Sequence, residues 1–385
     1  MTMLIPASNA VGPETVELLA RAVLSREVVD FVAGGAGDEV TLRQEREVYE
    51  RFVLEPRILT GVTQPNLETT LLGTRLSHPV CVAPMAYHRL VCPAGELATV
   101  AGAAGTGALT VVAALSSESM ENVAATAQAP LWFQLYCLRD RALTASLVHR
   151  AAAAGYRAIV LTVDAPRLGQ RWRDHRNGFS LPPEVVPANL VGAAAGVVSQ
   201  QDVGTSALAE HADLHHDASL SWDDIAWFRS LTGLPIVLKG VLSAADAVLA
   251  ADAGVDGIIV SSHGGRQLDR VAPALAALPA VVDAVGHQLE VYLDGGVRRG
   301  ADALTALGLG ARAVFVGRPI MWGLAADGPA GVESVLARIR DELSHAMVLA
   351  GGSCIDDLIG LVRPADDPDG ALARRPAVPK GGLRR

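Results

Sequence analysis

The chain has 385 residues, half of them hydrophobic and only 4% aromatic, with a formal net charge of -9. This length accommodates about two or three domains, or a single α/β barrel with extensions. The acidic balance disfavours nucleic acid and anionic membrane surfaces as partners, although a few local arginines can still bind a small anion. Four scattered cysteines without a C-x-x-C pair indicate a reduced protein without a zinc framework. There is no signal-peptide pattern and no apolar run of roughly 18 residues or more, so we expect a cytoplasmic protein without a membrane partner.

Residues 1–75 are expected to form a helical extension ahead of the main fold. Pro13-Glu-Thr-Val-Glu-Leu-Leu is typical of the start of a helix. Gly34-Gly-Ala-Gly37 interrupts the helical pattern. A further helix is predicted to follow it, with Asp38 as the N-cap.

From residue 79 onward, short apolar runs of strand length alternate with alanine-rich helical segments. This alternation predicts a parallel sheet. Eight such units in about 240 residues match a (β/α)8 barrel, which we assign to residues 76–362. A doubly wound open sheet is the alternative, but no G-x-G-x-x-G follows the first strand. The strand runs are 79–83, 109–114, 131–135, 157–163, 235–239, 256–261, 289–293 and 312–316, and the clearest helical segments are 95–104, 141–154, 243–254 and 300–307.

Two segments lack this rhythm. Residues 176–220, after the fourth strand, are irregular and predict a mobile lid. This long loop contains His211, His215 and His216, whose spacing could ligate a metal. No cysteine or second cluster supports that reading, so we expect solvated loop residues and no metal. Residues 363–385 are rich in Pro, Gly, Asp and Arg and predict a poorly ordered tail.

Six of the eight predicted strands end in polar or ionisable residues that a buried core does not require. The carboxyl ends of parallel barrel strands meet at one rim, where barrel enzymes have their active sites. We therefore expect an active site at this rim. The strand ends are Pro84-Met-Ala86, Ala113-Ala114, Gln134-Leu-Tyr136, Thr162-Val-Asp164, Lys239, Ser261-Ser-His263, Asp294-Gly-Gly296 and Gly317-Arg318.

Lys239 and His263 are the most reactive side chains at these ends. A lysine at the end of a buried strand must find a charge partner or lose its proton. Lys239 could be a Schiff-base nucleophile or a fixed cation beside an electron-rich ring. His263 is the natural proton acceptor near neutral pH, and Asp164 could orient it.

Arginines and glycines at the rim indicate anion binding. Arg171 and Arg266 could bind one carboxylate through forked hydrogen bonds. Barrels often bind phosphate with the loops after strands 7 and 8. There, the Asp294-Gly-Gly loop with Arg298 and Arg318 would supply backbone N–H groups and positive charge.

Five segments carry a resemblance to a known family. They include Ser-Ser-His-Gly-Gly-Arg-Gln-Leu-Asp at 261–269 and Leu-Asp-Gly-Gly-Val-Arg-Arg-Gly at 293–300, with further matches at 34–42, 132–136 and 161–167. On these residues the chain resembles the FMN-dependent α-hydroxy-acid oxidases and dehydrogenases, a family that includes glycolate oxidase, lactate oxidase and mandelate dehydrogenase. The likeness spans roughly residues 15–360 and looks closest to the 4-hydroxymandelate oxidases.

The resemblance implies FMN as cofactor, an (S)-2-hydroxy acid such as mandelate or 4-hydroxymandelate as substrate, and O2 as electron acceptor. His263, beside Asp164, would take the hydroxyl proton or hold it as hydride moves to the flavin. Tyr136 would bind the substrate oxygen, Arg171 and Arg266 the carboxylate. Lys239 would stabilise the reduced flavin. The other implied flavin contacts are Pro84, Met85, Ala86, Ala113, Gln134, Thr162, Ser261, Asp294, Gly295, Gly296, Arg298, Gly317 and Arg318.

The chain departs from the family pattern at several positions near the expected site. Phe31 stands where many members have Tyr, and Leu115 where glycolate oxidase has Trp. Both changes make the expected substrate site wider or more apolar, which suits an aryl substrate. Ala113-Ala114 replaces residues that often carry hydroxyl groups, and Ser262 replaces the usual Asn before the active histidine.

Alternative functions remain open on the sequence. A flavin dehydrogenase would act on the same substrates with an acceptor other than O2. Membrane-bound mandelate dehydrogenases of this family carry a membrane-associating insertion, but residues 176–220 contain no long apolar or basic amphipathic segment, which favours an oxidase. A Schiff-base aldolase or lyase would use Lys239, and a non-enzymatic barrel would not need the polar rim. Family members are often tetramers, so we expect a homo-oligomer.

Overall fold

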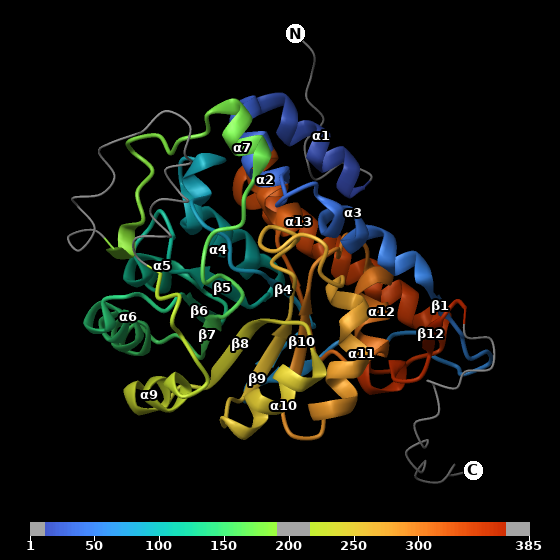
Figure 1. The fold of residues 1–385 in the computed structure, drawn as a ribbon. Coiled ribbons are helices and arrows are strands. Elements are labelled where there is room, and N and C mark those ends of the chain that lie inside the picture. Colours follow the sequence, from blue (N-terminus) through green and yellow to red (C-terminus); the bar gives the residue numbers. More distant parts are fainter. Residues whose placement is uncertain (1–11, 191–215, 367–385) are drawn as a thin grey trace.

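The centre of the protein is a closed barrel of eight parallel strands (Figure 1). The computed structural model describes residues 12–190 and 216–366. Each barrel strand coincides with a predicted apolar run, so the (β/α)8 barrel is confirmed and the open sheet is wrong. The strands are β4 (Val80–Val82), β5 (Thr110–Ala113), β6 (Leu131–Leu135), β7 (Ile159–Thr162), β8 (Ile236–Val241), β9 (Gly257–Val260), β10 (Glu290–Asp294) and β11 (Val314–Val316).

Alternate side chains of a barrel strand point inward. One apolar residue from each strand belongs to the cluster that fills the centre of the barrel. Trp132, Tyr292 and Phe315 are the largest, with ring centroids 5.5–5.8 Å apart. The hairpin of β2 (Thr69–Leu71) and β3 (Thr74–Leu76) adds Leu71 and Leu76 to this interior cluster. Glu290, at the start of β10, accepts a hydrogen bond from the Leu72 amide at 3.1 Å. The hairpin therefore closes the amino end of the barrel and leaves the carboxyl end for a site.

Helices surround the barrel and bury their apolar faces against the outer side of the strands (Figure 1). The predicted helical segments are confirmed to within a few residues. The last helix is interrupted by non-helical conformations at Asp327 and Gly328. The helices are α4 (Gly95–Thr106), α5 (Met120–Thr126), α6 (Arg141–Ala153), α9 (Asp224–Leu231), α10 (Ala244–Asp252), α11 (Ala274–Val285), α12 (Gly300–Gly308) and α13 (Arg318–Ala350).

The N-terminal extension contains α1 (Pro13–Val23), α2 (Arg26–Ala33) and α3 (Val40–Glu47). The predicted N-cap at Asp38 is wrong, because α3 begins at Val40 after Glu39, whose φ is 59°. The capping carboxylate comes instead from Asp269 in the barrel. It accepts hydrogen bonds from the amides of Thr41 at 2.9 Å and Asp38 at 3.0 Å. The start of α3 is thus attached to the loop after β9.

The predicted tail begins inside a strand, which corrects its boundary. β12 (Val362–Pro364) pairs antiparallel with β1 (Phe52–Leu54), while residues 367–385 lie outside the described residues. The first part of the long loop also packs on the barrel, since Asn189 Nδ2 donates to the Ala114 carbonyl at 3.2 Å. Residues 191–215 of the proposed lid are not described, whereas 216–220 are. Within 12–190 and 216–366, no helix has the length and apolar character needed to cross a bilayer.

Candidate active site

The site is built on an inward-facing layer at the carboxyl ends of the barrel strands. Because side chains alternate, the residue two positions after each interior residue also points inward. Trp132 is followed in this way by Gln134, and Val237 by Lys239. An apolar layer is therefore succeeded by a layer with polar members: Ala83, Ala113, Gln134, Thr162, Lys239, Ser261, Asp294 and Gly317.

A cavity of about 200 Å³ opens above this layer and brings most of the predicted residues together. Asp164 and Ser261 are the exceptions, since both lie behind the cavity wall and contact residues that line it. The predicted residues in the lining are Phe31, Pro84, Met85, Ala86, Ala113, Leu115, Gln134, Tyr136, Thr162, Arg171, Lys239, His263, Arg266, Asp294, Gly295, Gly296, Arg298, Gly317 and Arg318.

Lys239 is buried and bound on two sides. Its Nζ lies 3.1 Å from the Asp294 carboxylate and donates a hydrogen bond to Ser261 Oγ at 3.0 Å. Burial alone would lower the pKa of Lys239, but the negative charges of Asp294 and Asp164 outweigh burial and raise it. Lys239 is therefore a cation at neutral pH, which favours the fixed-cation reading over a Schiff-base nucleophile.

His263 is held by Asp164 in a backbone conformation that is rare for a residue with a side chain. Its φ is 57°, and its Nδ1 lies 2.9 Å from Asp164 Oδ1. Burial and the positive charge of Lys239 lower the pKa of His263, although Asp164 acts in the opposite direction. A neutral imidazole that donates from Nδ1 to Asp164 leaves Nε2 as a proton acceptor.

Arg171, after β7, and Arg266, after β9, both lie beside the ring of Phe31. Their guanidinium carbons lie 5.8 Å and 5.2 Å from the ring centroid. Arg171 lies 3.7 Å from the Asp174 carboxylate, and Arg266 Nη1 donates to the carbonyls of Phe31 and Gly34. Burial lowers the pKa of both arginines, and the charge of Arg171 lowers that of Arg266 further. Two buried cations with so little compensating charge suit a bound anion.

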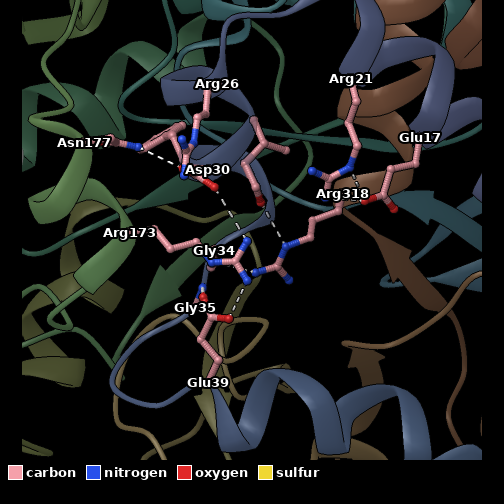
Figure 2. Close-up of polar contacts among 12 residues, drawn as sticks. Glu17, Arg21, Arg26, Asp30, Gly34, Gly35, Glu39, Arg173, Asn177 and Arg318 are labelled. Carbon is pink, nitrogen blue, oxygen red and sulfur yellow. Dashed lines mark hydrogen bonds and ion pairs between the residues drawn. The ribbon is translucent and has the colours of Figure 1, made fainter.

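The cavity lining is apolar at Phe31, where many members of the resembled family have Tyr. The Phe31 ring stacks on Phe179, with centroids 4.6 Å apart and an interplanar angle of 10°. Figure 2 shows how the neighbouring α7 (Trp172–Asn177) is fastened to the N-terminal extension. Arg173 lies 2.5 Å from Glu39 and 3.7 Å from Asp30. The N-terminal extension thus forms part of the site.

Arg318 connects the barrel to the link between α2 and α3 (Figure 2). Its guanidinium donates to the carbonyls of Val32, Gly34 and Gly264 at 2.9–3.0 Å. One hydrogen on each terminal nitrogen remains for a ligand. Burial and the neighbouring charge of Arg298 lower the pKa of Arg318 to about 10. Like the pair at Phe31, these arginines suit an anion.

The chemistry of the lining fits FMN. Arg298 and Arg318 offer positive charge to a phosphate. Asp294 Oδ1 is buried and lacks a hydrogen-bond partner among the described residues, so it can accept from a ribityl hydroxyl. Lys239 offers a buried positive charge to a ring that gains electrons.

His216 is a site residue that the sequence analysis misjudged. The expectation of a solvated loop residue is wrong, since His216 is only 6% exposed. Its ring stacks on Tyr136 with centroids 4.4 Å apart, and its backbone bridges Leu138. It lines both the main cavity and a second cavity of about 330 Å³. No local pattern marks it, because its partner Tyr136 lies just after β6, far away in sequence. His211 and His215 are outside the described residues.

The closed barrel, the arginines that line its cavity and the buried lysine are typical of a cofactor-dependent barrel enzyme. The family model described as FMN-dependent dehydrogenase matches residues 20–361. The chain belongs to this family, and FMN is its cofactor.

Relatives and solved structures cover nearly the whole chain. An L-lactate oxidase from Nostoc sp. is 47% identical over 89% of this chain and 94% of its own length. A glycolate oxidase from Spinacia oleracea is 43% identical over 93% of this chain and 96% of its own. The crystal structure of a mandelate oxidase with (S)-4-hydroxymandelic acid matches 92% of this chain and 99% of that chain, with a TM-score of 0.89 and 43% identity.

Proposed function

We propose that the protein oxidises an (S)-2-hydroxy acid with an aryl side chain, mandelate or 4-hydroxymandelate, to the 2-oxo acid, while O2 is reduced to hydrogen peroxide. The observation that carries the proposal is the pair of buried arginines beside the ring of Phe31. A substrate carboxylate relieves the repulsion between the arginines. An aryl ring finds an apolar partner in Phe31.

His263 is the proton acceptor in this scheme. Its Nε2 takes the proton of the substrate hydroxyl, and Asp164 stabilises the imidazolium that results. FMN, when bound, would supply the acceptor for the α-hydrogen of the substrate and for the two electrons that leave the substrate. Lys239 stabilises the negative charge that the cofactor gains, because it is a buried cation before the reaction starts.

Tyr136 orients the substrate oxygen. Burial raises the pKa of its hydroxyl group, so the hydroxyl remains a hydrogen-bond donor at neutral pH. Its ring is fixed by the stack on His216. The other cavity-lining residues that the resemblance implies as flavin contacts are assigned to the cofactor in this proposal.

The size of the substrate side chain is the finer part of the proposal. Phe31, Phe179 and Leu115 supply apolar surface, and the structural neighbours include a mandelate oxidase with (S)-4-hydroxymandelic acid. The relative from Nostoc sp. is an L-lactate oxidase, which makes a small side chain the competing assignment. Anaerobic flavin reduction by (S)-mandelate, L-lactate and glycolate separates the two. We expect kcat/KM to be highest for (S)-mandelate; a preference for L-lactate would contradict the aryl assignment.

Arg171 is the variant that tests the carboxylate site. Arg171→Met should raise the KM for the hydroxy acid by at least about tenfold, the factor for one charged hydrogen-bond pair. Arg176→Met is the matched control, since Arg176 is exposed on α7, the helix that begins directly after Arg171. Equal effects in both variants would contradict the assignment.

Two alternative functions have less support. A dehydrogenase with another electron acceptor shares every residue role above and is distinguished by peroxide formation. A Schiff-base aldolase or lyase needs a neutral Lys239, but the raised pKa keeps this side chain protonated. We also propose a homo-oligomer, a tetramer by family resemblance, which light scattering of the purified protein tests.

A further inference from the structure

The residue before His263 is tied to a buried carboxylate on the N-terminal extension. Ser262 Oγ donates a hydrogen bond to Glu45 Oε1. The same carboxylate oxygen accepts from the Ala274 amide at 3.0 Å. Ser262 Oγ in turn accepts from the Gly265 amide at 3.1 Å. The turn that carries His263 is therefore closed by Ser262 and anchored to Glu45.

Glu45 also lies against the loop after β10. It is 2% exposed, and its Oε2 lacks a hydrogen-bond partner among the described residues. A Cβ at Gly295 would lie 2.5 Å from this oxygen, and a Cβ at Gly296 would lie 2.0 Å from the Glu45 carbonyl oxygen. The two glycines thus allow α3 to pack directly against the loop assigned to the cofactor. One carboxylate contacts both the substrate-side turn and the cofactor-side loop.

Charged and titratable groups from several elements of the described chain face Glu45. Asp294 on β10 raises its pKa, and Arg318 at the start of α13 lowers it. Tyr49, next to α3, donates its hydroxyl to the Gly295 carbonyl at 2.7 Å, and the charge of Glu45 contributes to raising its pKa. Burial is the largest influence on Glu45 and raises its pKa to about 7. Glu45 therefore changes charge close to neutral pH.

We propose that Glu45 is a positioning residue for the turn of His263 and that its charge state is transmitted to this turn through Ser262. An ionised acceptor strengthens the bond from the Ser262 hydroxyl. The left-handed conformation of His263 persists only where its surroundings hold it. The turn is therefore held most firmly when Glu45 is ionised. The effect on catalysis rests on the proposed role of His263 as proton acceptor.

Glu45→Gln tests this inference without removing the side chain. The amide oxygen still accepts from Ser262 and Ala274, but the charge and the titration are lost. Glu47→Gln is the matched control, because Glu47 is exposed on the same helix. In the holoenzyme, histidine-selective NMR should show a second inflection near pH 7 in the titration of His263. We expect Glu45→Gln to lose this inflection and Glu47→Gln to keep it.

The rate of anaerobic flavin reduction provides the second readout. In the wild type and in Glu47→Gln it should rise about fivefold through neutral pH, the factor for one strengthened hydrogen bond. In Glu45→Gln and in Ser262→Ala this rise should disappear, and the double variant should resemble either single one. A Glu45→Gln protein that keeps the inflection of His263 would overturn the inference. If no hydroxy acid reduces the flavin, the proposed function fails, but the NMR titration still decides the role of Glu45.

Discussion

At the scale of single residues, the surroundings of Lys239 and His263 give the two side chains different charge states at neutral pH. Asp294 and Asp164 outweigh burial at Lys239 and raise its pKa, whereas burial lowers the pKa of His263. One side chain is therefore charged at neutral pH and the other is a neutral base. This difference supports our proposal that Lys239 serves the cofactor and His263 the substrate.

Removal of the base should stop the chemistry and leave the cofactor in place. We expect His263→Ala to slow anaerobic flavin reduction by roughly 10²–10⁴-fold, the usual contribution of a general base. FMN content should stay unchanged, because this variant keeps the predicted phosphate contacts Arg298, Arg318 and the Asp294-Gly-Gly loop. Stopped-flow absorbance measures the rate and the flavin band measures the content. Reduction at the wild-type rate would show that another group accepts the proton.

His216 should control how firmly Tyr136 is held. His216→Ala removes a stack worth about 1 kcal/mol and opens the wall between the two cavities. We therefore expect kcat/KM for (S)-mandelate to fall about fivefold, with a smaller fall for a substrate that has a bulky ring substituent. His216→Phe retains the stack and should stay near the wild type. If Ala and Phe variants behave alike, stacking is not the function of His216.

At the scale of elements, α3 acts as a brace between two glycine-containing loops. A Cβ at Gly265 would lie 2.7 Å from the Leu42 amide nitrogen, and one at Gly296 would meet Glu45. Both glycines also have positive φ values, 70° and 74°. These glycines are thus required by the packing of α3 as much as by any ligand.

Gly296→Ala should cost far more stability than alanine at a glycine with the same φ and free space. Gly73 has a φ of 79° and no neighbouring atom within 4 Å of a Cβ, so Gly73→Ala should cost only about 1–2 kcal/mol. Gly296→Ala should cost roughly 3 kcal/mol or more and weaken FMN binding. Urea denaturation and FMN titration measure the two effects. Equal losses in both variants would contradict the brace.

The buried carboxyl of Glu45 should make stability depend on pH. Because folding raises its pKa from 4.5 to about 7, its contribution is fully present below pH 4.5 and is lost as pH rises through 7. Glu45→Gln does not titrate. The free energy of unfolding of the wild type should therefore fall by about 3 kcal/mol more than that of Glu45→Gln when the pH is raised from 4 to 8. Urea denaturation at both pH values tests this, and a constant difference would contradict it.

At the scale of the whole molecule, the sequence predicts the features that depend on periodicity and fails where distant segments meet. The barrel was predictable because its strands are continuous apolar runs, and the rim because Lys239 and His263 lie at the ends of such runs. Asp269 as the cap of α3, and Glu45 as the partner of Ser262, were not predictable, because each contact joins residues more than two hundred positions apart. The pairing of β1 with β12 escaped prediction for the same reason.

For the whole molecule, we propose that the barrel couples oxidation of an aryl 2-hydroxy acid to the reduction of O2. The most direct measurement is the yield of hydrogen peroxide and of 2-oxo acid from (S)-mandelate in air-saturated buffer, with purified holoenzyme. We predict equimolar amounts of the two products. Formation of the 2-oxo acid with an artificial acceptor, but without peroxide, would contradict the oxidase assignment. Absence of any 2-oxo acid would contradict the proposed reaction itself.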